Sequence, residues 1–228
     1  MKKGFSIKIS DKKTDIKSFV SGEYDDVYLQ TEHFDFLLEG VLLNKKKLLT
    51  EYALKDFETL IRELYTQKKQ GLIQEFEGEF RGFIWNKKEG KLYVFTNPTS
   101  TQRVFYSKFK NEIFIDTSLV RLNKTLLSSG IRTTPDLESI YQLLCFSNLP
   151  ERKTPIENIA KLLDGHYLEV NCPDLSFSEK EYFNLSEIPV FKGTKAAAVD
   201  QIHEIFAQSV IMEYQKDTEL GKNHLALL

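Results

Sequence analysis

The first 120 residues alternate between apolar and polar positions as in a sheet protein with one inserted helix. Short polar turns separate the apolar segments, and this favours antiparallel pairing because parallel strands need a long crossover. The predicted strands are 27–29, 34–42, 80–85, 92–96, 104–106 and 113–115. We expect the last four to form an antiparallel meander.

Residues 51–69 change to helical spacing, with apolar side chains three or four positions apart. These side chains are Leu54, Phe57, Leu60, Ile61, Leu64 and Tyr65. Thr50 is placed to cap this helix, and Gly71 to stop it.

Beyond residue 125 the pattern becomes more helical. A helix is predicted to start at Thr134-Pro135-Asp136, with apolar positions at Leu137, Ile140, Tyr141 and Leu144. Thr154–Glu157 has the spacing of a capping box with a proline at the first helical position, so a second helix is expected there. The Asp164-Gly165 turn then leads into a strand at 167–170, with 177–183 as its hairpin partner.

The C-terminal segment contains a linker at 184–193, a helix at 194–215, and four apolar residues after His224. An apolar run of this kind indicates a buried strand that is just starting, because an exposed edge strand would need cover. We therefore expect His224–Leu228 to begin a further domain.

Composition narrows the class of protein. The chain has 228 residues, 41% of them hydrophobic and 28% charged, which predicts a packed core rather than disorder. The net charge of −2 argues against a nucleic-acid binder. No apolar run is long enough to span a membrane, so no membrane partner is expected. Cys145, expected in the core, and Cys172, expected in a turn, are too few for a disulfide scaffold, which favours a cytoplasmic location.

The usual catalytic motifs are absent. There is no glycine-rich phosphate loop, zinc-protease helix or hydrolase nucleophile elbow. The four histidines have no metal-ligand spacing, so no metal site is expected. We interpret Lys45-Lys46-Lys47 as a solvated turn. Asp25 and Asp26 look exposed, and the sequence assigns them no partner.

Several segments together resemble a known family. Glu77–Asn86 is similar to the strand L-x-G-x-F-A-F-A-x-W-D of class II glutamine amidotransferases, Thr96–Tyr106 to their R-D-x-x-G-x-x-P-L-Y-Y, and Phe114–Ser118 to their F-A-S-E. Pro150–Leu168 resembles P-x-x-x-T-x-F-x-x-I-x-K-L-x-P-G-H-x-L of the asparagine synthetase branch. The segment 194–228 resembles the lead-in to the pyrophosphatase loop of that branch, and the chain stops where the loop would begin.

The resemblance implies an α+β fold, a four-layer αββα sandwich of two antiparallel sheets of the N-terminal-nucleophile hydrolase type. It divides the chain into a glutaminase-like domain at 1–188 and, at 189–228, a linker, a helix and the first strand of an α/β synthetase domain. ATP and Mg are implied only for that synthetase domain, so no cofactor is expected in this chain. The implied partner is the C-terminal synthetase domain, and a homodimer is left open.

In the family an N-terminal cysteine attacks the side-chain amide of glutamine, with its own α-amino group as general base. The Cys-Gly-Ile of the family aligns with Lys3-Gly4-Phe5, so Lys3 occupies the nucleophile position. A lysine amine is mostly protonated at neutral pH and is then a poor nucleophile. The alignment therefore predicts no catalytic residue in this chain.

Other positions of the glutamine pocket also depart from the family. The oxyanion-binding asparagine aligns with Glu39, whose charge would repel a developing oxyanion. The aspartate that pairs with the glutamine amino group aligns with Asn97, and the following glycine with Ser100. Including the retained glycines and turn asparagine, the vestigial pocket would comprise Gly4, Glu39, Gly40, Asn44 and Asn97.

Three hypotheses follow. The first is a degenerate glutaminase-like domain of an asparagine synthase (glutamine-hydrolysing)-like protein, without glutamine hydrolysis and serving as a structural or regulatory partner of an ATP-dependent amide-forming domain. The second is a stand-alone module that binds a small ligand or a protein. The third is an active glutaminase, which would need processing that exposes Ser6.

Overall fold

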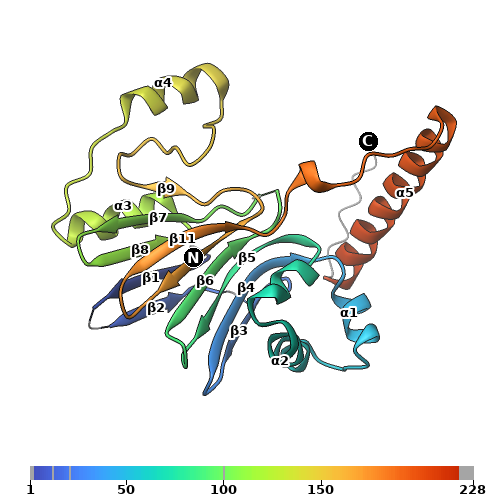
Figure 1. The fold of residues 1–228 in the computed structure, drawn as a ribbon, viewed down its shortest axis with the longest axis horizontal. Coiled ribbons are helices and arrows are strands. Elements are labelled where there is room, and N and C mark those ends of the chain that lie inside the picture. The colour runs from blue at the N-terminus through green and yellow to red at the C-terminus, as the bar shows by residue number, and fades with distance from the viewer. Residues whose placement is uncertain (1–2, 12, 21, 100, 221–228) are drawn as a thin grey trace.

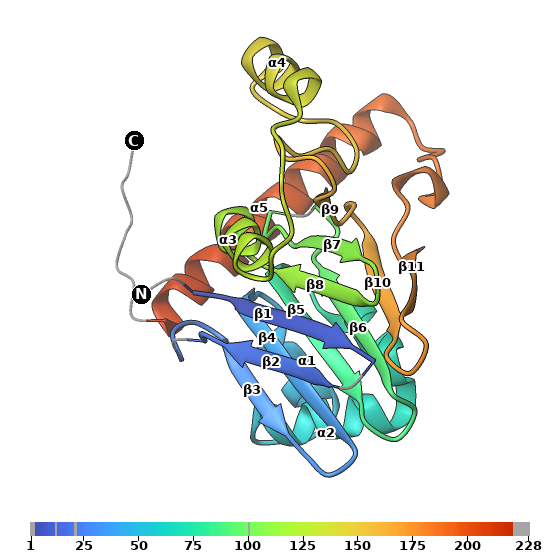
Figure 2. The same cartoon turned by 90° about the vertical axis from the view of Figure 1, so that its left-hand side faces the viewer.

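The computed structural model describes residues 3–220 except 12, 21 and 100, and shows two antiparallel sheets stacked face to face (Figure 1, Figure 2). Helices lie on the outer faces of both sheets. The predicted αββα sandwich is confirmed.

The smaller sheet has the strand order β2-β1-β8-β7-β9. Its strands are β1 (Phe5–Ser10), β2 (Thr14–Ser18), β7 (Phe105–Phe109), β8 (Glu112–Asp116) and β9 (Ala160–Lys161). Alternate side chains of β1 point to opposite faces, as the pleat requires. Phe5, Ile7 and Ile9 are buried against the other sheet, whereas Ser6 faces outwards with Lys8.

The larger sheet has the order β11-β10-β6-β5-β4-β3. Its strands are β3 (Val27–Gln30), β4 (Phe34–Leu42), β5 (Gly78–Asn86), β6 (Lys91–Thr96), β10 (His166–Asn171) and β11 (Ser176–Glu181). The predicted hairpins β5–β6, β7–β8 and β10–β11 are confirmed. The single meander was wrong, because the chain crosses between sheets after β6 and puts β7 and β8 in the smaller one.

Three apolar clusters define the layers. One fills the space between the sheets, with Phe5, Leu37 and Phe83 among its members. A second lies between the larger sheet and the helices α1 (Lys45–Glu51) and α2 (Phe57–Lys68), followed by the 3₁₀ helix η1 (Lys69–Glu75). The third lies between β8 and α3 (Leu119–Ser128). Burial of these side chains is the main favourable term that holds the layers together.

Two expectations near the first helices were wrong. The lysines 45–47 form the first turn of α1 rather than a solvated turn, and Thr50 lies inside that helix instead of capping the next. Asp56 caps α2, because its carboxylate accepts a hydrogen bond from the Thr59 amide at 2.8 Å. The helix ends at Lys68, with Lys69 at positive φ, so Gly71 is not its stop but lies inside η1.

The capping box at Thr154 does not start a helix. The Thr154 hydroxyl bonds to the carbonyls of Ile156 and Ile159, and Pro135 and Ile156 form an isolated β-bridge. Short polar side chains can form local hydrogen bonds that compete with the backbone hydrogen bonds of a helix. Here the Thr154 hydroxyl forms such local bonds, and the segment is a loop. The chain then enters β9.

The helix predicted after Asp136 is present as α4 (Leu137–Phe146), and Asp136 caps it. It projects from the sandwich (Figure 1). Leu137, Tyr141, Leu144 and Phe146 are 70% or more exposed. Cys145 is exposed as well, so the expectation that it lies in the core was wrong.

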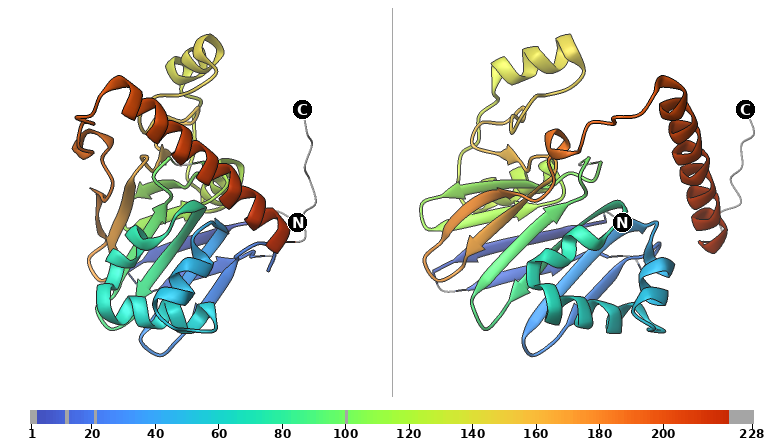
Figure 3. Two further views of the ribbon diagram at one scale, coloured as in Figure 1. Left: turned by 90° about the vertical axis from the view of Figure 1, so that its right-hand side faces the viewer. Right: turned by 45° about the vertical axis from the view of Figure 1, so that its right-hand side comes forward.

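The last helix, α5 (Lys195–Glu219), follows the short 3₁₀ helix η2 (Leu185–Glu187) and an irregular segment. It runs beside the sandwich (Figure 3). Apolar side chains along it, including Ile202 and Phe206, are exposed. The strand expected at 224–228 lies outside the described residues. None of the helices described here combines the length and apolar character that a membrane span requires.

Candidate functional site

The residues of the predicted glutamine pocket come from the start of β1, the end of β4 and the end of β6. β4 pairs with β5, and β5 with β6, so the sheet brings Glu39, Arg81 and Thr96 side by side. Arg81 was not singled out from the sequence. Its partner Glu39 could have indicated it, because a buried carboxylate needs a cation or donors.

Lys3, which the resemblance aligns with the family's nucleophile, forms an ion pair with Glu23, and its ammonium lies 4.8 Å from the ring centroid of Tyr24. The hydrogen bond to Glu23 raises the pKa of Lys3 and outweighs the opposing effect of desolvation. A raised pKa keeps the amine protonated at neutral pH, and a protonated amine has no lone pair to attack an amide.

Gly4 has a positive φ of 119° and packs directly on Thr117. A Cβ at this position would lie 1.8 Å from the Thr117 hydroxyl oxygen. The hydroxyl in turn accepts from the Phe5 amide at 3.2 Å, and Arg121 donates to the Phe5 carbonyl at 3.1 Å. This glycine therefore fixes how the first strand enters the sheet.

Glu39 and Arg81 form a buried ion pair between the two sheets. The Arg81 Nε lies 2.8 Å from Glu39 Oε2, and the side chains are 12% and 8% exposed for Arg81 and Glu39. Their neighbours on the same face, Leu37 and Phe83, belong to the cluster between the sheets. Arg81 Nη1 also donates to the carbonyls of Arg103 at 3.0 Å and Thr117 at 3.3 Å.

The Glu39–Arg81 ion pair thus connects β4 and β5 to the segments that flank β7 and β8. The pair needs no further counter-ion, because the guanidinium of Arg81 neutralises the carboxylate of Glu39. A carboxylate at this position offers no hydrogen-bond donor to an oxyanion.

Gly40 and Asn44 hold backbone geometry. Gly40 has φ of 134°, and a Cβ there would lie 2.1 Å from the Glu79 carbonyl oxygen; its amide donates to Asp26 at 2.9 Å. Asn44 is buried and bridges two segments, donating to the Glu75 carbonyl at 2.7 Å and accepting from the Glu77 amide at 3.1 Å. These contacts account for both residues structurally.

Asn97 is buried, and its side chain is used within its own loop. Its Nδ2 donates to the Thr99 hydroxyl at 2.9 Å, and its Oδ1 accepts from Thr101 at 3.2 Å. It borders a cavity of about 510 Å³ whose wall includes Phe76, Glu77 and Tyr182. The neutral amide supplies no charge to pair with an amino group.

Asp25, expected to be exposed, is only 3% exposed and lies at the centre of a charged cluster that holds the end of α5. Its carboxylate contacts Lys216 at 2.7 Å and Lys45 at 2.9 Å, and accepts from the Leu42 amide at 2.8 Å. Burial by itself would raise the pKa of Asp25, but these hydrogen bonds outweigh it, and the pKa is lowered.

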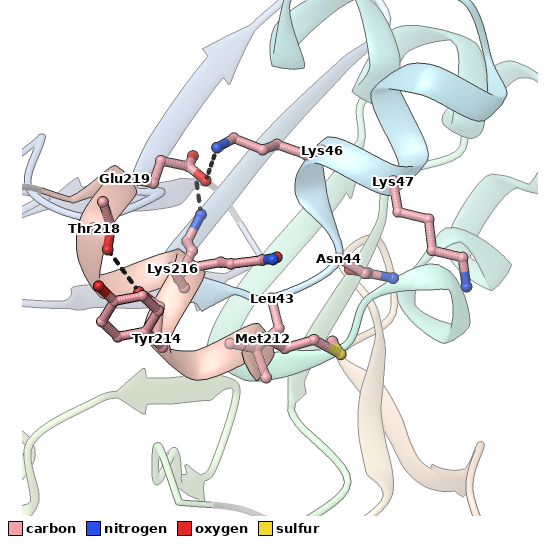
Figure 4. A pocket seen from close by; sticks show the side chains of 10 residues that line it. Leu43, Asn44, Lys46, Lys47, Met212, Tyr214, Lys216, Thr218 and Glu219 are labelled. Atoms are coloured by element: carbon pink, nitrogen blue, oxygen red, sulfur yellow. Dashed lines mark hydrogen bonds and ion pairs between the residues drawn. The ribbon is translucent and has the colours of Figure 1, made fainter. Parts of the chain in front are cut away.

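The cluster continues across the surface. Glu219 contacts both Lys216 and Lys46 at 3.3 Å, at the rim of a pocket of about 510 Å³ between α5 and the body (Figure 4). Within the described residues, no group of three or more histidine, cysteine, aspartate or glutamate side chains is placed to hold a metal ion.

Comparison with known proteins gives a consistent result. Residues 31–183 match a glutamine amidotransferase domain. The chain is 25% identical over 201 residues to asparagine synthetase [glutamine-hydrolyzing] 2 of Bacillus subtilis (strain 168), covering 81% of this chain and 26% of that protein. It is 22% identical over 200 residues to asparagine synthetase [glutamine-hydrolyzing] 1 of the same organism, covering 84% of this chain and 30% of that protein.

The chain therefore spans less than a third of the length of these curated relatives. A solved glutamine phosphoribosylpyrophosphate amidotransferase from Bacillus subtilis aligns with a TM-score of 0.48 and 10% identity, over 79% of this chain and 43% of that one. The domain match covers most of the chain, from β4 to β11, and includes Glu39 on β4, Arg81 on β5 and Asn97 directly after β6. This chain belongs to the glutamine amidotransferase domain family, and its relatives include asparagine synthetases.

Proposed function

We propose that this chain is a glutamine amidotransferase domain that has lost glutamine hydrolysis and acts as a structural or regulatory partner of an ATP-dependent amide-forming domain. The observation that carries the proposal is the buried Glu39–Arg81 pair. It places a neutralised carboxylate and its guanidinium where an active member needs a free donor for the oxyanion.

The nucleophile position supports the same conclusion. Amide hydrolysis in this family begins with attack by a side chain whose proton is removed by a nearby base. Lys3 instead carries a proton that Glu23 stabilises, and its pKa is raised rather than lowered. Lys3 therefore offers no free nucleophile and Glu39 no oxyanion donor, so the residues at these two positions do not support the first chemical step.

Processing that exposes Ser6 would not restore the site. Ser6 lies inside β1, where it pairs with Lys17 on one side and Asp116 on the other. Its side chain belongs to the outer face of the sheet, facing away from Glu39 and Arg81. Removing the residues before it would also remove Phe5, which is fully buried in the core.

The partner role is supported by apolar surface on the two helices that leave the sandwich. α4 exposes Leu144 and Phe146 at 79% and 73%, and α5 exposes Ile202 and Phe206 at 67% each. Large contiguous patches of exposed apolar side chains often mark sites where another protein binds. ATP and Mg would belong to the partner domain, which would use ammonia or another amine from solution.

The proposal is tested by glutamate release. The purified chain is incubated with glutamine at neutral pH, and glutamate is measured by a coupled glutamate dehydrogenase reaction. A Bacillus subtilis asparagine synthetase serves as positive control. The expected rate equals that of buffer. Glutamate formed in proportion to enzyme concentration, and abolished by Lys3→Met, would overturn the proposal.

A further inference from the structure

A small hollow lies where the foot of α4 meets β9 and the start of β7. It has a volume of about 160 Å³, roughly five times the volume that one water molecule occupies in the liquid. Three cationic residues and no acidic residue line it. The polar residues of the lining are Arg103, Ser147, Asn148, Lys153, Thr154 and Lys161.

Two of the three cations have no anionic partner in contact. Lys153 is paired with Glu138 at 2.7 Å, so its charge is balanced. Within the described part of the chain, the Arg103 guanidinium makes no ion pair and no hydrogen bond. Lys161 reaches only a carbonyl, that of Leu149, at 3.4 Å. The hollow therefore carries unbalanced positive charge.

Burial lowers the pKa of Lys161, and the charge of Arg103 lowers it further. Asp164 opposes these two effects, but it is exposed and is not part of the lining. A lysine whose charged form is disfavoured in this way gains from an anion placed beside it.

The backbone holds the two cations in fixed relation. Lys161 pairs with Phe105 in the β7–β9 ladder, and the Leu162 amide donates to the Val104 carbonyl at 2.9 Å. The Arg103 carbonyl is held by Arg81 at 3.0 Å. Side chains that start from such a ladder lose less freedom when they bind a ligand than side chains on a mobile loop would.

We propose that this hollow is a binding site for a small oxyanion, a phosphate or carboxylate group, held by Lys161 and Arg103. Charge-assisted hydrogen bonds from two cations are the usual means of holding such groups. The volume admits a group of this size but is smaller than the pockets that take drug-sized ligands. The site is separate from the Glu39–Arg81 pair and does not depend on the loss of glutamine hydrolysis.

The test uses the ¹⁵N-labelled chain, titrated with inorganic phosphate in one arm and succinate in the other, with ionic strength held constant by chloride. We expect saturable amide shifts at residues 147–161 in at least one arm. Saturation by phosphate alone identifies a phosphate site, and saturation by succinate alone a carboxylate site.

Three variants test the assignment. Lys161→Gln and Arg103→Gln should each raise the dissociation constant on the order of tenfold, as expected for one charge-assisted bond. Lys124→Gln, an exposed lysine on α3, should leave it unchanged. Because Arg103 is exposed, Arg103→Gln should fold normally, and it tests the site even if Lys161→Gln disturbs the fold. No saturable shift in either arm, or equal affinity in Arg103→Gln and the parent chain, would overturn the proposal.

Discussion

The Glu39–Arg81 pair makes a prediction about stability that depends on which partner is removed. In Arg81→Met, Glu39 stays buried at 8% exposure without its cation, and the carbonyls of Arg103 and Thr117 lose their shared donor. In Glu39→Gln, Arg81 keeps its hydrogen bonds to both carbonyls, and the new amide oxygen can still accept a hydrogen bond from Arg81 Nε. Arg81→Met should therefore be the more damaging change.

The magnitudes follow from burial. Removing one partner of a buried ion pair costs about 3–5 kcal/mol, because the other charge is left uncompensated. Glu39→Gln keeps hydrogen bonds to a charged group, so about 1–3 kcal/mol is expected. The double variant Glu39→Leu/Arg81→Met removes both charges, and its loss should fall well below the sum of the single losses. For a protein of this size, Arg81→Met should lower the melting temperature by roughly 6–20 °C.

The assay is urea unfolding of the parent, both single variants and the double variant, followed by circular dichroism and by tryptophan fluorescence. Trp85 lies on β5, the strand that carries Arg81, and reports on the sheet that would be disturbed. The reasoning would be refuted if Arg81→Met were no less stable than Glu39→Gln. Simple additivity in the double variant would also refute it, because two side chains in contact must couple.

Three further predictions concern Gly4, Asp25 and the cysteines. Gly4→Ala should destabilise the chain by several kcal/mol or prevent folding, because the added methyl group has no space. Thermal melting checks this, with Gly22→Ala as the control, because no atom lies within 4 Å of a Cβ added at Gly22. The pKa of Asp25 is lowered in the folded chain, so its ionised form contributes stability at neutral pH, and this stability is lost as the pH falls below about 4. Asp25→Asn should therefore be less stable than the parent at pH 7, and its denaturant midpoint should fall less on acidification. An equal dependence of the midpoint on pH in the two proteins would contradict this. Cys145, exposed, should react quickly with a thiol reagent, and Cys172, whose pKa burial raises, slowly; equal rates would contradict the burial of Cys172.

The sequence predicts most of the longer strands, because apolar alternation reports directly which side chains face a core. It did not predict β1, β2 or the two-residue β9, although Phe5, Ile7 and Ile9 of β1 alternate in the same way. Phe80, Phe83 and Leu92 have no other stable place than between layers, and each is fully buried. The sequence also indicated why Gly4 and Gly40 match the glycines of the family: both were expected at tight backbone positions. Both have positive φ, and a Cβ at either would strike a neighbouring segment.

What the sequence could not supply is pairing between distant residues. Asp25 and Lys216 are far apart in the chain, and nothing local distinguishes Asp25 from its exposed neighbours, yet the two meet at 2.7 Å. The same holds for Arg81, whose role depends on β4 lying beside β5 in the right register. Local signals failed at Thr154, where a loop used the hydroxyl that a helix cap would need.

We propose that none of the described residues is able to attack glutamine. The most direct test is intact mass spectrometry after incubation with 6-diazo-5-oxo-L-norleucine, a glutamine analogue that alkylates the attacking residue of active glutaminases. The account predicts that the mass of the chain is unchanged while a Bacillus subtilis asparagine synthetase is labelled. A stoichiometric adduct that maps to the start of β1 and is blocked by glutamine would contradict it.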